Sequence, residues 1–314
     1  LSILKRLLAC VFTGALIGFA MYLFKLQNER ESIVKREVGE SDSQEARVFD
    51  LKWDREIREI SDSLASLREK LSAKPRSEAV AEIEVFLRKG KDRKTGLILK
   101  FGEGGGIEGW PTLRVFLLDL LLELDPKAAA RISREILSSK TSADEWAIAL
   151  RNVAKGERIG GNRDYLRTRA EDLITNPEWQ AQPSVGYLNA FDVLVYTEAT
   201  ESSPLLSGLI QRKDRHDLAH ASFLTLDRLV QLQPLDMLTR LKDDRALQES
   251  RPEMTAQQFA RADLRDTSQQ EIVKLWLLDP SRTQIQLHHF SAIFPNNNQL
   301  ISHNLLTSQE QVSG

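Results

Sequence analysis

Helix start signals recur at short intervals from residue 77 onward, and they constrain the fold more than any other feature of the sequence. Asp125-Pro126 places an N-cap aspartate before a proline that suits the first helical turn. Ser142-Ala143-Asp144-Glu145 has the pattern of a capping box. Together with apolar residues at helical spacing, these signals predict about a dozen short helices. They begin near Ser77, Trp110-Pro111, Asp125, Ser142, Asn162, Ser184 and Ser203 and continue over 217–232, 235–241, 268–278 and 280–290.

Strand signals are nearly absent. Gly96–Phe101 is the one apolar run with strand character, and the sequence offers no second run to pair with it. The chain is therefore expected to be all-α. Helices joined by short turns pack as antiparallel neighbours, and a dozen of them cannot share the core of one bundle. Residues 77–314 are expected to stack antiparallel helical hairpins as an α-solenoid, ending in a polar C-terminal tail.

A short motif occurs twice at the junctions between helices. Leu122-Glu123-Leu124-Asp125-Pro126 is echoed by Trp276-Leu277-Leu278-Asp279-Pro280. With this motif and its helix lengths, the region 77–306 resembles a degenerate HEAT- or TPR-like helical-repeat array without a constant period. The resemblance implies a long concave surface that binds other proteins and carries no chemistry.

Residues 7–24 form an uncharged run bounded by Arg6 and Lys25. With these basic residues snorkelling, the run is long enough to cross a bilayer as a helix. A cleaved signal peptide lacks its cleavage site here, and a lipoprotein signal would need the apolar stretch before Cys10, not after it. Residues 1–25 are thus interpreted as a single-pass membrane anchor. Gly14 and Gly18 form a Gly-x-x-x-Gly pair, a pattern that favours packing between membrane helices.

Cys10 is the only cysteine of the chain. The absence of cysteine from the rest of the chain favours an oxidising compartment for that part. We therefore expect the soluble part to lie outside the cytoplasm.

Residues 26–76 read as a juxtamembrane segment followed by a stalk helix that starts near Ser41-Asp42-Ser43-Gln44 and stops at Lys74-Pro75. Its apolar side chains repeat at alternating spacings of four and three, the pattern of a heptad seam. Two interpretations remain open: a coiled coil that pairs two subunits into a homodimer, or a helix that docks on its own domain. The seam consists of Trp53, Ile57, Ile60, Leu64, Leu67 and Leu71.

Two motifs hint at chemistry. His216 and His220 are four residues apart and, on a helix, could share a zinc ion as in metalloproteases, but Asp217 replaces the glutamate that serves there as general base. Gly104, Gly106 and Gly109 match a dinucleotide-binding pattern but lack the surrounding βαβ unit. A loop between the first helices and the main array is the interpretation we favour for this glycine-rich stretch.

Charge and motif content limit the functional classes. The net charge of −2 disfavours nucleic acid as a partner, and no nucleophile–base arrangement or cofactor motif stands out. The sequence predicts a membrane-anchored helical-repeat scaffold that binds other proteins, without catalysis or a cofactor. The alternatives are a membrane-tethered metallohydrolase that uses His216 and His220, and a purely structural oligomer.

Overall fold

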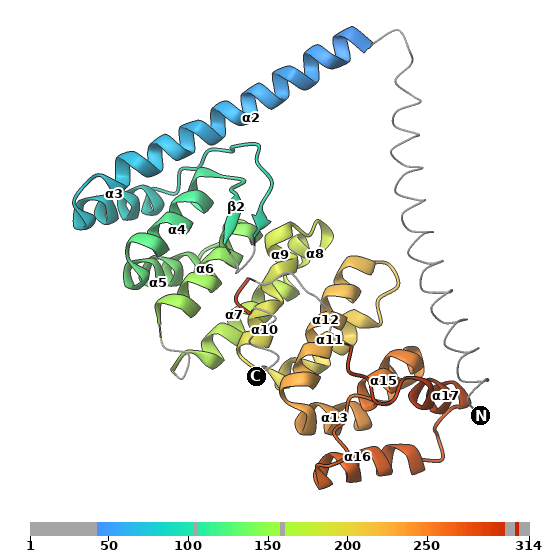
Figure 1. Ribbon diagram of the computed structural model, residues 1–314. Helices are drawn as coiled ribbons and strands as arrows, with labels where there is room; N and C mark the ends of the chain where they lie inside the picture. The colour runs from blue at the N-terminus through green and yellow to red at the C-terminus, as the bar shows by residue number, and fades with distance from the viewer. Residues whose placement is uncertain (1–42, 103–105, 158–160, 299–304, 308–314) are drawn as a thin grey trace. The chain divides into compact units, whose positions relative to one another are not determined.

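The structure is a computed structural model that describes residues 43–102, 106–157, 161–298 and 305–307 (Figure 1). The expected anchor at residues 7–24, with Gly14 and Gly18, lies outside the described residues. In the part that is described, every helix is too short or too polar to traverse a bilayer.

The chain divides into two units, Leu1–Asp62 and Ser63–Gly314. The division falls inside helix α2 (Ser43–Ser72), which begins and ends close to the limits expected for the stalk helix. All elements after α2 belong to the second unit.

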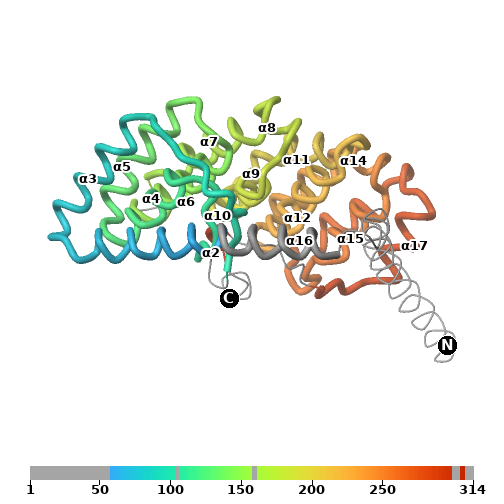
Figure 2. The backbone as a smooth tube through the Cα atoms, turned by 90° about the horizontal axis from the view of Figure 1, so that it is seen from above, coloured from blue at the N-terminus to red at the C-terminus, as the bar shows by residue number. Residues whose placement is uncertain are grey.

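The second unit is built almost entirely of helices, as Figure 2 shows. Helices hold 71% of the described residues and strands 3%, which confirms the all-α prediction. The helices are α3 (Arg76–Arg88), α4 (Leu113–Leu124), α5 (Pro126–Ile136), α6 (Ala143–Gly156), α7 (Arg163–Thr175), α8 (Pro177–Ala181), α9 (Val185–Ala190), α10 (Asp192–Tyr196), α11 (Ser203–Ile210), α12 (His216–Leu232), α13 (Pro234–Asp243), α14 (Arg245–Ser250), α15 (Pro252–Phe259), α16 (Thr267–Leu278) and α17 (Gln284–Ile293), with a 3₁₀ turn at Thr200–Ser202.

The sequence signals for helix starts operate as expected at two junctions. The Asp125 carboxylate accepts the backbone N–H groups of Lys127 and Ala128, each at 3.0 Å, and so caps α5. The Ser142 hydroxyl accepts the N–H of Glu145 at 3.2 Å and caps α6. The reciprocal half of this capping box is missing, because the Glu145 side chain binds Arg114 instead.

The expectation that the run Gly96–Phe101 has no partner strand is wrong. Strand β1 (Lys100–Phe101) pairs antiparallel with β2 (Ile107–Gly109), and Lys94 pairs with Thr112 further along. The two backbone segments approach so closely that a Cβ on Gly109 would lie 2.1 Å from the carbonyl oxygen of Ile98. Because the partner strand is three residues long and ends in glycine, its sequence carries no strand signal.

The helices also differ from the expectation in other places. The apolar segment after Ser184 is two helices, α9 and α10, separated at Phe191. Helices α8, α14 and α15 were not expected. The last helix starts at Gln284 rather than Pro280, because the Asp279 carboxylate accepts the N–H of Ser281 at 2.8 Å in a turn, while Thr283 forms a complete capping box.

Helices of the second unit pack mainly on helices close to them in the chain. Helix α5 lies against α6, α11 against α12, and α15 against α17. Apolar side chains between these helices are removed from water, which is the main stabilising contribution to such packing. Helix α4 is buried continuously from Arg114 to Leu121, and α6 is buried continuously from Glu145 to Ala154.

Candidate functional site

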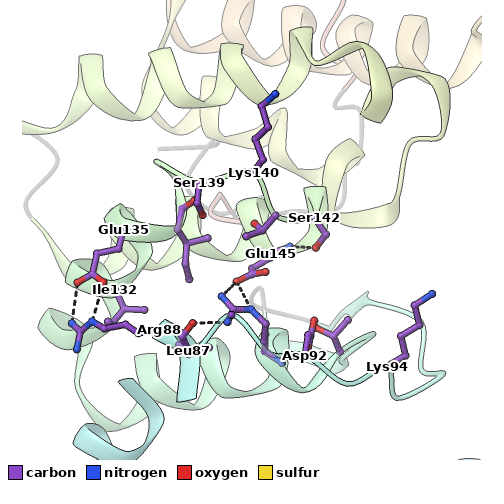
Figure 3. Close-up of a pocket in the computed structure, with 15 residues that line it drawn as sticks. Leu87, Arg88, Asp92, Lys94, Ile132, Glu135, Ser139, Lys140, Ser142 and Glu145 are labelled. Carbon is purple, nitrogen blue, oxygen red and sulfur yellow. Dashed lines mark hydrogen bonds and ion pairs between the residues drawn. The ribbon is translucent and has the colours of Figure 1, made fainter. Parts of the chain in front are cut away.

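An open groove of about 790 Å³ lies at the ends of four helices of the second unit and is here called the α3–α6 groove (Figure 3). Its walls come from the end of α3, the segment that follows it, the start of α4, the end of α5 and the start of α6. Leu87, Ile132 and Ile136 are buried beneath it. The groove thus combines an apolar floor with polar helix ends.

A buried ion pair joins two sides of the groove. The Arg114 Nε and Nη2 groups donate to Glu145 Oε1 at 2.9 and 2.5 Å, and both side chains are nearly inaccessible, at 6% and 4%. Arg114 Nη1 also donates to the carbonyl oxygen of Leu87 at the end of α3, at 2.5 Å. Because the charges are paired and bonded, neither residue is available as an acid or a base.

The rim of the groove is basic. Residues 88–94 read Arg-Lys-Gly-Lys-Asp-Arg-Lys, and of their five basic residues Arg88 and Lys94 line the groove, with Lys140 on the opposite side (Figure 3). Lys94 and Lys140 are both exposed, and within the described residues neither forms an ion pair. Our sequence reasoning missed this rim, although the basic run itself is visible in the sequence.

A second hollow of about 450 Å³ lies near β2 and is lined by two ion pairs. The Asp119 carboxylate accepts Arg151 Nη2 at 2.6 Å and Trp110 Nε1 at 2.9 Å. Burial and then the neighbouring charge of Arg151 lower the pKa of Lys155 from its usual value. Both lining carboxylates are engaged, Asp119 by Arg151 and Trp110 and Glu123 by Arg68.

The histidine pair on α12 is not assembled into a metal centre. His216 and His220 lie one turn apart at the start of the helix. Arg215 holds the Asp217 carboxylate at 3.1 and 2.7 Å and keeps its pKa below the usual range. Across the described residues, no group of three or more His, Cys, Asp or Glu side chains is arranged to hold a metal ion. The hydrolase interpretation stays a prediction.

The heptad seam on α2 is divided. The side chain of Trp53 is outside the described part, and Ile57 is 37% exposed. Leu64 and Leu71, in the second unit, are only 6% and 4% exposed. Ile60 and Leu67 are half-buried.

Arg68, on the same end of α2, anchors that part of the helix to α4. Its guanidinium lies 5.6 Å from the ring centroids of both Trp110 and Phe116 and bonds Glu123 at 2.6 Å. Residues 63–72 of the seam therefore dock on their own domain. The coiled-coil interpretation stays a prediction for the residues before them.

Comparison with known proteins gives no further assignment. No family model matches the chain, and neither a curated protein nor a solved structure does so. The functional argument therefore depends on the chain's own geometry.

Proposed function

We propose that this chain is a membrane-anchored helical-repeat scaffold whose α3–α6 groove binds an acidic segment of another protein. The single observation that carries the proposal is the open groove with its basic rim and apolar floor. Lysines without an ion partner are free to pair with carboxylates of a ligand, and buried aliphatic side chains under them favour a peptide with apolar residues between its charges.

The packing of the second unit supports the repeat-like part of the proposal. The main helix contacts join helices one to three elements apart in the chain, which is compatible with antiparallel hairpins stacked into an α-solenoid. In such an array, one edge is formed by successive helix ends. The groove lies at such an edge, where binding does not require the core to open.

The anchor is proposed from the sequence alone. Residues 7–24 would hold the scaffold at a membrane, with the helical domain on the extracytoplasmic side. Deleting residues 1–25 should release the remainder into the supernatant after a high-salt wash. A truncated chain that still sediments with membranes would contradict the anchor.

The groove is tested by site-specific photocrosslinking in native membranes. A photoreactive residue at Ser139, on the rim, should capture a partner through an acidic segment that mass spectrometry can identify. The matched position is Thr239, which is exposed on α13 and should not capture the same partner.

Charge reversal distinguishes groove binding from general electrostatic attraction. The variant Lys94→Glu/Lys140→Glu should lose the Ser139 crosslink, and Lys127→Glu/Lys213→Glu, with the same change of net charge at exposed positions, should keep it. Equal loss in both variants, or crosslinks to nucleic acid, would overturn the proposal.

A further inference from the structure

A three-residue segment near the C-terminus is built into the second unit. Sequence patterning predicts a polar tail, yet Leu305 is fully buried and Thr307 is only 6% exposed. Residues 305–307 lie against α10 and α12, which are more than seventy residues away in the chain. The segment therefore occupies a formed site rather than trailing from the last helix.

The side chain of Asp192, the first residue of α10, binds backbone groups of this segment. Its Oδ2 accepts the N–H groups of Leu306 and Thr307 at 2.7 and 2.9 Å. Its Oδ1 accepts the hydroxyl of Thr307 at 2.5 Å. Two consecutive amides on one carboxylate oxygen can be supplied by any residue other than proline, so the backbone contributes affinity with little regard to sequence.

Arg228 on α12 completes the site. Its Nη1 donates to Asp192 Oδ1 at 2.7 Å, and its Nη2 donates to the hydroxyl of Thr307. The side chains of Arg228 and Asp192 are 4% and 3% exposed. Apart from Leu306 and Thr307, no described residue donates to Asp192 Oδ2, so without the segment a buried carboxylate oxygen lacks its donors.

We propose that Asp192 and Arg228 form a peptide-recognition site for a short Leu-x-Thr segment, and that the chain's own residues 305–307 occupy it in cis. The backbone amides provide affinity, while the buried leucine and the hydroxyl provide selectivity. This site is separate from the α3–α6 groove, and the inference does not depend on the function proposed for that groove.

The test uses a variant chain as the receptor and a separate peptide as the ligand. The receptor is the full chain in detergent with Leu305→Asp/Thr307→Val, which displaces its own segment, and the probe is a fluorescent peptide of residues 301–311. Fluorescence anisotropy should show saturable binding to this receptor. The native full chain should bind the peptide at least about ten-fold more weakly, because the tethered segment competes at a high effective concentration.

Two peptide variants test whether the site recognises the backbone N–H group of residue 306. Leu306→Pro removes one amide donor and should weaken binding at least about ten-fold, whereas Leu306→Ala keeps the donor and should bind much as the parent peptide does. If the first receptor fails to fold, Thr307→Pro provides a second one that removes a donor without placing a charge in the core. Absence of binding at about 1 mM peptide to a folded receptor would overturn the proposal, as would equal affinity of the proline and alanine peptides.

Discussion

The ion pair between Arg114 and Glu145 offers a quantitative test of how the groove is held together. Both side chains are nearly inaccessible, and Glu145→Gln removes the carboxylate charge while keeping an oxygen that can accept from Arg114. The substitution leaves the guanidinium buried with the carbonyl of Leu87 but without a counter-ion. Breaking a buried pair from one side costs about 3–5 kcal/mol.

The retained oxygen in Glu145→Gln places the expected cost near the lower end, at about 3 kcal/mol. For a unit of this size, that loss lowers the melting temperature by about 6–12 °C. Arg114→Met should cost at least as much, because it leaves a carboxylate buried and removes the donor to Leu87. The double variant should be more stable than the sum of the single losses predicts, with a coupling of about 2 kcal/mol.

The assay is thermal unfolding followed by circular dichroism on the four members of this cycle. The matched control is the pair Arg88–Glu135, which lies in the same groove at 2.9 Å but is about half exposed on both sides (Figure 3). Arg88→Met and Glu135→Gln should each lower the melting temperature far less, because solvent screens an exposed pair. Additive effects in the Arg114–Glu145 cycle, or equal losses in both cycles, would refute the reasoning.

Three further predictions concern other parts of the second unit. Leu64→Lys places an ammonium at a buried position of α2 and should lower the melting temperature by several degrees without changing the sedimentation of the chain, whereas Ala65→Lys on the exposed side should do neither; a change in oligomeric state would favour the coiled coil. Trp276→Ala removes a fully buried ring stacked 4.4 Å from Phe259 and should cost about 3–5 kcal/mol in denaturant unfolding, and a loss below about 1 kcal/mol would contradict the packing. Burial lowers the pKa of His289 from its usual 6.5, so the unfolded chain binds the proton more tightly and the free energy of unfolding should fall as the pH drops through 6.5. His289→Gln should reduce the dependence of the unfolding free energy on pH near 6.5, and an unchanged dependence would contradict the role given to His289.

The helix content of this protein is encoded locally. Asp125 and Ser142 cap their helices through hydrogen bonds to groups two or three residues away, so a reader of the sequence can place α5 and α6 without knowing the rest of the fold. The break at Lys74-Pro75 is local in the same sense, because proline cannot continue the helix before it. Where the local signal is weak, as at α14 and β2, the sequence did not reveal the element.

The sites were decided by tertiary structure. Arg114 and Glu145 are 31 residues apart, and Asp192 and Thr307 are 115 apart. Whether such groups meet depends on how the helices between them pack, which is a property of the whole apolar surface and not of any short motif. The sequence alone therefore determined that this chain is helical and where most of its helices begin. Only packing between distant segments decided which charges are paired in the core and which lysines remain free at the rim of the groove.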